Sequence, residues 1–288
     1  MSCKRYILTN KSNTPQYFNY KKCDGYLVQQ VRLNVGQTKN VNMVEGSYSS
    51  SFKNIEISLP TETEVIVEPT ENLLGRIYSV DTRDLNFLIS DKLPLTVPKQ
   101  KTSRYWPSNI WSGDQGRTPM CVGFAWAHWI EDGPVMHNGP KPIIPPQLIY
   151  SEAQKIDEWP GEGYAGTSVR AGAKYLKNTG KIGSYYWAYD VNTLINTVLN
   201  VGPVVVGTNW YYGMFFPSRA AQIRISGQVV GGHAYVINGV DTKTRMFRLK
   251  NSWGLRWGIM GHAYISFDDM SRLILERGEI CLAKENNF

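Results

Sequence analysis

Residues 114–131 of this 288-residue chain read DQGRTPMCVGFAWAHWIE, and they decide how the rest of the sequence is interpreted. From Cys121 onward the stretch is apolar with helical periodicity, so we predict a helix over residues 121–130. A cysteine that opens a helix lies near unpaired backbone N–H groups and the positive end of the helix dipole, which favour the thiolate. Cys121 is therefore a candidate nucleophile whose pKa we expect below that of a free thiol. Taken alone, the segment favours a small buried hydrophobic residue at Cys121 over a nucleophile.

Three side chains elsewhere supply the chemistry that a nucleophilic thiol needs. A thiolate that attacks an acyl carbon requires a base near neutral pH, and imidazole suits this role. His233 begins a predicted strand in GGHAYVINGVD, behind two glycines that allow another segment to approach closely. Asn251, at the end of a later predicted strand, can accept a hydrogen bond from the second ring nitrogen and orient the ring. Gln115, upstream of Cys121, is a candidate oxyanion donor.

Taken together, these segments resemble the papain-like C1 cysteine peptidases. The motifs are QG with the cysteine six residues after the glutamine, then GHA, then NSWGLRWGIMG, and the resemblance covers roughly residues 75–288. It implies an α+β papain-like fold, with a helical half, a β-barrel-like half and a cleft between them. It also implies that Cys121 is the nucleophile, His233 the general base and Asn251 the orienting residue. Gln115 and the backbone N–H of Cys121 would form the oxyanion hole.

The same resemblance implies a set of substrate-binding residues. The segment GYAGTSVRAGAKYLKNTG (residues 163–180) is similar to a family segment whose glycine, here Gly166, lines the cleft and bonds extended substrate backbone. Small residues near the pocket for the residue two before the scissile bond imply a roomy or shallow pocket, and Trp253 would shield the His233–Asn251 bond. The full substrate-binding set is Gly166, Thr167, Ser168, Gly207, Gly232 and Trp253.

Some features depart from the family pattern. Thr118 replaces the usual cysteine three residues before the nucleophile, so that family disulfide is absent. Val122 replaces the usual tryptophan after the nucleophile. No helical inhibitory propeptide is recognisable. The four cysteines form no CxxC pair, so we expect no zinc site, and we assign neither a metal nor a cofactor.

The first part of the chain has a different texture. Short alternating stretches separated by turn residues predict an all-β sandwich module over residues 1–75, and residues 76–288 form the predicted peptidase domain. The module is loosely similar to β modules of virion and tail proteins of large tailed phages. That likeness implies a virion or other particle partner bound through residues 1–75. The alternatives are a module that covers the cleft and one that only stabilises the enzyme.

Periodicity and turn residues also place the elements of the second part. Helices are predicted over residues 121–130, 147–156, 168–176 behind a capping Thr167, and 191–199 behind a capping Asp190. Strands are predicted over residues 204–206, 234–237, 246–249, 263–265 and 280–283.

Composition excludes several other classes. Hydrophobic residues make up 42% and aromatic residues 12%, which is unlike a disordered chain. No apolar run reaches the length of a membrane span, and the start lacks the pattern of a secretory signal, so we expect synthesis in the cytoplasm, with virion association a further expectation of the module. The net charge of +7 is scattered without like-charge blocks, which gives no indication of nucleic-acid binding.

The function predicted from the sequence is cysteine endopeptidase activity on a protein or peptide substrate, through a thiolate nucleophile and an acyl-enzyme. The alternative is a structural or attachment protein of the virion type that retains the papain-like scaffold with little or no activity. A cell-wall amidase is a third class, but such proteins typically lack the glutamine and NSWG segments.

Overall fold

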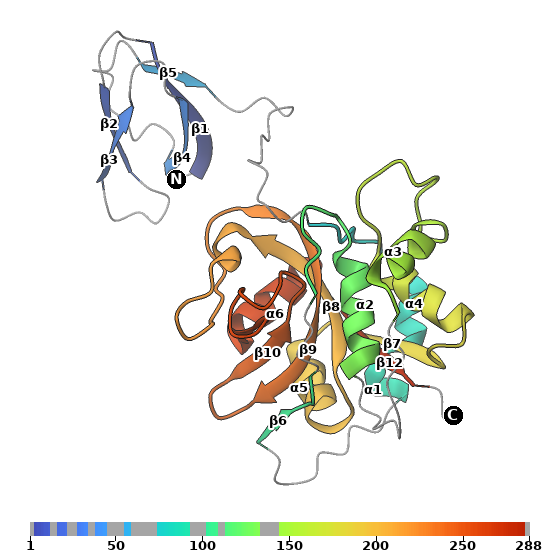
Figure 1. Ribbon diagram of the computed structural model, residues 1–288. Coiled ribbons are helices and arrows are strands. Elements are labelled where there is room, and N and C mark those ends of the chain that lie inside the picture. The colour runs from blue at the N-terminus through green and yellow to red at the C-terminus, as the bar shows by residue number, and fades with distance from the viewer. Residues whose placement is uncertain are drawn as a thin grey trace. The chain divides into compact units, whose positions relative to one another are not determined.

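The computed structural model describes residues 3–11, 16–21, 28–33, 38–44, 55–58, 74–92, 102–108, 113–132 and 144–285. The chain divides into two compact units, Met1–Glu68 and Pro69–Phe288 (Figure 1). The predicted boundary between residues 75 and 76 therefore falls inside the second unit. In the part that the structure describes, no helix is both long enough and apolar enough to cross a membrane.

The described elements of the first unit are all strands, as the alternation of its sequence predicts. A three-stranded antiparallel sheet has the order β4-β1-β5, and β2 pairs with β3 in a separate antiparallel ribbon. The strands are β1 (Cys3–Asn10), β2 (Gln16–Lys21), β3 (Val28–Leu33), β4 (Thr38–Val44) and β5 (Ile55–Ser58). Leu8 of the central strand β1 is fully buried.

The second unit begins with helical elements. These are η1 (Thr82–Phe87), α1 (Ile89–Lys92), α2 (Cys121–Asp132), α3 (Pro146–Gln154) and α4 (Val169–Asn178). The predicted cap of α4, Thr167, is one residue too early, because Ser168 accepts the hydrogen bond from the N–H of Ala171. The Thr167 hydroxyl instead donates to Asp157 at 2.7 Å. The carboxylate of Asp157 thus competes for the side chain that the sequence suggested as a cap.

A sheet with the strand order β11-β10-β9-β8-β12-β7 follows, with β6 paired to β9. The strands are β6 (Ser103–Tyr105), β7 (Ser184–Ala188), β8 (Val204–Tyr211), β9 (Val229–Asp241), β10 (Met246–Lys250), β11 (His262–Ser266) and β12 (Glu279–Lys284). The remaining helices are α5 (Val191–Asn200), η2 (Tyr212–Phe215) and α6 (Phe267–Leu275). The Asp190 carboxylate caps α5 as predicted. Sequence periodicity did not indicate β7 or α6.

Alternation along the strands builds two hydrophobic clusters on opposite faces of this sheet. Val204 and Val206 of β8 pack in the cluster that includes residues of α5 and α6. Val205 between them joins the cluster formed around α2 and α4, together with Ala234 of β9. Figure 1 shows α2 running beside β8 and β9, and α2 packs against both strands. The helix that begins with Cys121 thereby packs against the strand that contains His233.

Candidate active site

Cys121 is the first residue of α2 and is fully buried. Backbone N–H groups of Ala234, Gly75 and Val122 act on its sulfur and lower the pKa of the thiol. Ala234 directly follows His233 in β9, so the thiol lies against the strand that carries the candidate base. Cys121 and Cys281 are free thiols, whereas Cys23 and the side chain of Cys3 lie outside the described residues.

The geometry around His233 defines which ring nitrogen carries the proton. His233 is fully buried, and its Nε2 lies 2.7 Å from Asn251 Oδ1. The same oxygen accepts the backbone N–H of Ser252 at 2.8 Å. Because a backbone N–H can only donate, the atom that it meets is the amide oxygen, and Nε2 must donate to that oxygen as well. The neutral ring then has its lone pair on Nδ1, which makes no hydrogen bond among the described residues.

Aromatic rings surround the His233 imidazole. Trp253 stacks on it, with ring centroids 4.7 Å apart and planes inclined by 28°. Trp210 meets it edge-on at 4.8 Å. Phe215 in turn stacks on Trp253 at 5.1 Å. The sequence placed Trp253 in the substrate-binding set, and the structure places it against the candidate base, where it excludes water from the ring.

Gln115 reaches the same region through a short antiparallel contact between two loops. Its backbone N–H donates to the Ser252 carbonyl at 2.8 Å, and Gly254 donates to Gly113 at 2.8 Å. The Ser252 hydroxyl donates to Gln115 Oε1 at 2.6 Å, while Gln115 Nε2 donates to the Thr118 carbonyl at 2.8 Å. The residue after Asn251 thus holds the candidate oxyanion donor, which joins Gln115 to the His233 region of the site.

Burial controls the ionisation of the two central groups. Removal from water raises the pKa of Cys121 to about 11 and lowers the pKa of His233 to about 4. The expected low thiol pKa is therefore wrong for this closed arrangement. The backbone N–H groups at the sulfur lower the pKa, but desolvation outweighs them. At neutral pH the pair is thiol and neutral imidazole.

Acid should destabilise the second unit through His233. Its pKa falls from 6.5 to about 4 on folding, so the unfolded chain binds the extra proton in this window, and stability is lost as the pH falls. Between pH 7 and pH 4 this group should cost about 3 kcal/mol of unfolding free energy. Urea unfolding at both pH values measures the loss, and His233→Ala should show a correspondingly weaker pH dependence. An equal dependence in both proteins would contradict the assignment.

A segment of the chain's own backbone lies over the thiol. We call residues 74–77 (LGRI) the strap. The backbone N–H of Thr167 donates to the Gly75 carbonyl at 2.9 Å, and the Thr167 carbonyl accepts from the backbone N–H of Ile77 at 2.9 Å. The backbone N–H of Arg76 donates to the Gly232 carbonyl at 3.0 Å. The backbone that pairs with this extended segment is that of Thr167, one residue after the predicted Gly166.

Glycines of the predicted substrate-binding set make room for the strap. A Cβ on Gly166 would lie 2.5 Å from the Gly75 carbonyl oxygen, and one on Gly232 would lie 2.1 Å from the Arg76 carbonyl oxygen. A Cβ on Gly207 would lie 2.8 Å from Arg76 Nε. Thus Gly166, Thr167, Gly207 and Gly232 all border residues 74–77, while Ser168 caps α4.

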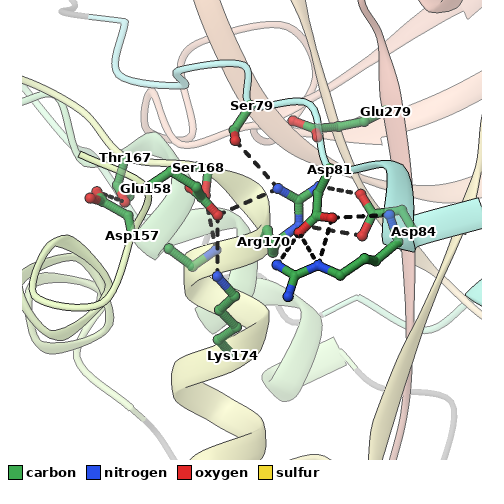
Figure 2. Close-up of polar contacts among 12 residues, drawn as sticks. Ser79, Asp81, Asp84, Asp157, Glu158, Thr167, Ser168, Arg170, Lys174 and Glu279 are labelled. Carbon is green, nitrogen blue, oxygen red and sulfur yellow. Dashed lines mark hydrogen bonds and ion pairs between the residues drawn. The ribbon is translucent and has the colours of Figure 1, made fainter.

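Sequence reasoning missed two buried ion pairs that hold the strap and the residues after it. Arg76 Nε lies 2.9 Å from Glu279 Oε1 at the start of β12. Arg170 of α4 pairs with Asp84 of η1 and also contacts Glu158, and Figure 2 shows this network around the Arg170 guanidinium. The sequence shows only that charged residues such as Glu279 stand next to apolar stretches, which is a weak indication of a buried ion pair. The sequence contains nothing that identifies the partner.

A pocket of about 280 Å³ lies elsewhere, beside η1, α4 and β7, and residues such as Asp84, Lys174 and Tyr185 line it. Its lining includes none of the four proposed catalytic residues. Cys121 itself is fully buried, and Gly75 of the strap lies close to it, since its backbone N–H acts on the thiol and a Cβ on Gly75 would lie 1.9 Å from the Pro119 carbonyl oxygen.

Solved structures with similar backbones are cysteine proteases. Xylellain, a cysteine protease from Xylella fastidiosa, superposes with a TM-score of 0.57 at 20% identity, covering 78% of this chain and 100% of that chain. ProCathepsin B S9 from Trypanosoma congolense superposes with a TM-score of 0.54 at 13% identity, covering 74% of this chain and 83% of that chain. The bromelain protease from Ananas comosus superposes with a TM-score of 0.50 at 16% identity, covering 65% of this chain and 100% of that chain. These likenesses show a papain-like fold and confirm the predicted α+β class.

Sequence comparison adds a distant viral relative. An uncharacterized peptidase C1-like protein of Acanthamoeba polyphaga mimivirus is 19% identical over 196 residues. The match covers 52% of this chain and 62% of that protein, so the chain spans less than two thirds of its relative's length. No family model matches the sequence.

Proposed function

We propose that this protein is a papain-like cysteine peptidase with Cys121 as nucleophile and His233 as general base. The observation that carries the proposal is the His233–Asn251 bond of 2.7 Å, which leaves Nδ1 without a hydrogen bond among the described residues. The residue after His233, Ala234, has a backbone N–H that lowers the pKa of the Cys121 thiol. A thiol, a neutral imidazole and an orienting amide are the groups that acyl transfer needs. The papain-like fold supports the same assignment.

The reaction follows from these groups. His233 Nδ1 accepts the thiol proton, and the sulfur attacks the peptide carbonyl carbon to form a tetrahedral oxyanion. The Cys121 backbone N–H and the Gln115 amide are the proposed donors to that oxyanion. The C–N bond breaks as the imidazolium gives its proton to the departing amine. Water, deprotonated by His233, then hydrolyses the thioester and releases the acid and the free thiol.

A second candidate is a papain-like scaffold protein without activity. The observation that favours it is the complete burial of both Cys121 and His233. A protein of this kind would have no need for the strap to move. Labelling of the thiol separates the two functions.

An epoxide inhibitor that alkylates activated thiols should modify Cys121 with one equivalent per chain, detected by intact-mass and peptide mass spectrometry. The modification should disappear in Cys121→Ala and slow strongly in His233→Ala. The Cys281→Ala variant is the matched control. It removes the other described buried thiol, and its Cys121 should still be labelled. Failure of Cys121 to react in the folded protein, with the strap in place or displaced, would favour the scaffold function.

The role of residues 1–75 stays a prediction. The comparisons give no support to a virion or phage-like partner. We propose that the first unit, Met1–Glu68, carries the module, whereas residues 74 and 75 belong to the second unit.

A further inference from the structure

We propose that the strap is a built-in occupant of the peptide-binding site, and that the site holding the Arg76 side chain selects an arginine or lysine of the substrate. The inference rests on the proposed function, since it assigns the backbone of Thr167 and Gly232 to substrate binding. The selecting group is Glu279.

The strap makes the contacts that any extended peptide could make. Its three hydrogen bonds to Thr167 and Gly232 all use main-chain atoms, so they do not depend on the strap's side chains. Main-chain pairing of this kind supplies affinity, and the side-chain sites supply specificity. A peptide that displaced the strap could therefore replace these bonds one for one.

The strap lies beside the thiol, and the Gly75 carbonyl of the strap already accepts a hydrogen bond from another segment. The backbone N–H of Gly75 lowers the pKa of the Cys121 thiol, and the Gly75 carbonyl oxygen accepts from the Thr167 N–H at 2.9 Å. Nucleophilic attack needs a carbonyl carbon in front of the sulfur and donors around the developing oxyanion. Because the Gly75 carbonyl oxygen is hydrogen-bonded to the Thr167 N–H, this carbonyl is held by the pairing with Thr167, and the strap acts as a ligand of the site.

The Arg76 side chain shows what the neighbouring site accepts. Its side chain is only 1% exposed, with Nε 2.9 Å from Glu279 Oε1 and Nη2 2.7 Å from the Arg277 carbonyl. Gly207 leaves space for the guanidinium, because a Cβ there would lie 2.8 Å from both Arg76 Nε and Glu279 Oε1. The site thus accommodates a long cationic side chain, and the buried carboxylate of Glu279 lies at the inner end of the site.

If the strap left the site, the buried carboxylate of Glu279 would lose its ion-pair partner, Arg76. The Glu279 side chain is 3% exposed, and burial raises its pKa while Arg76 acts in the opposite direction. Arg170 also acts on Glu279, but it is already paired with Asp84 and Glu158. A buried carboxylate that loses its partner is destabilised, so an incoming arginine or lysine regains what Arg76 provided.

Anchoring keeps the strap at high effective concentration. Arg170 holds Asp84 and contacts Ser79, shortly after the strap in the sequence (Figure 2). A tethered segment competes with free ligands at an effective concentration in the millimolar range. Weakening the strap should therefore expose the thiol.

The first arm of the test displaces the strap in the full-length chain. Gly75→Ala would place a Cβ 1.9 Å from the Pro119 carbonyl oxygen, and Arg76→Ala removes the buried ion pair. Each should raise the rate of epoxide labelling at Cys121 at least about tenfold, because the closed thiol is shielded. Gly163→Ala, whose Cβ would meet nothing within 4 Å, is the matched control and should leave the rate unchanged. Equal rates in all four proteins would overturn the strap assignment.

The second arm measures specificity without needing catalysis. The full chain carrying Cys121→Ala, Gly75→Ala and Arg76→Ala is titrated with fluorescent pentaalanine peptides whose central residue is arginine, norleucine or glutamate. The arginine peptide should bind at least about tenfold more tightly than the others, because its guanidinium bonds with a buried carboxylate. Adding Glu279→Gln should remove that preference.

Equal binding of the three peptides would overturn the assignment of the Arg76 site. The proposed function fails on a different result, the absence of Cys121 labelling in both closed and opened proteins. The two failures can therefore be told apart.

Discussion

Replacing His233 with alanine is expected to lower kcat/KM for a peptide substrate by about 10³-fold or more, since the thiol would lose the base proposed to accept its proton. The ring is held for this role by Asn251 on one side and by the faces of Trp253 and Trp210. Asn251→Ala should cause a smaller loss, because the imidazole remains but its orientation and tautomer are no longer fixed.

A matched histidine tests whether the loss is local. His262 Nε2 lies 3.0 Å from the Ser108 hydroxyl, outside the proposed catalytic group, so His262→Ala should retain most of the activity. Comparable activity losses for the two alanine variants would contradict a catalytic role for His233. Tryptophan fluorescence of each variant checks that Trp210 and Trp253 still have their folded environment.

Replacing Asp132 with alanine should destabilise the second unit by about 3–5 kcal/mol, the usual cost of removing one partner from a buried ion pair. Asp132 ends α2 and Lys250 ends β10, and both side chains have no solvent exposure. Lys250 Nζ lies 2.9 Å from each carboxylate oxygen. The pair joins the helix that begins with Cys121 to the residue that precedes Asn251, so its loss should affect the site as well.

Urea unfolding followed by tryptophan fluorescence measures this change cleanly. All nine tryptophans lie between residues 106 and 257, so the signal reports the second unit alone. Adding Lys250→Met to Asp132→Ala should recover much of the stability, because no unpaired buried charge remains. Asp268→Ala removes an exposed partner of Arg245 and should cost less than about 1 kcal/mol. A cost for Asp132→Ala as small as that of the exposed pair would contradict the role of the buried pair.

Local sequence patterns predicted much of the second unit because their causes are local. The apolar stretch after Cys121 forms α2, and Asp190 caps α5 with its own carboxylate. The same reasoning placed the α4 cap at Thr167 instead of Ser168, because two adjacent hydroxyl residues are equivalent in sequence. The acceptor at Asp157 distinguishes them, and it lies in another segment.

The candidate chemistry was also accessible from sequence, whereas its ionisation was not. A cysteine, a histidine, an asparagine and a glutamine in motifs like those of papain-like peptidases identified the four candidates. The expected low thiol pKa depended on a solvent-accessible sulfur at a helix start. The fully buried sulfur loses its solvation in the folded chain, and this raises the pKa although the backbone N–H of Gly75, outside the family motifs, acts in the opposite direction.

The amino-acid order by itself indicated most of the helices and strands of the second unit and the side chains proposed for acyl transfer, because hydrophobic periodicity, caps and motif spacing act over a few residues. Only the tertiary structure decided what lies over the thiol and what meets Arg76. The Arg76–Glu279 contact spans 203 positions of the chain, and no local rule selects one carboxylate among many at that separation. Such a pair forms only where packing brings the strap and β12 together and removes both charges from water.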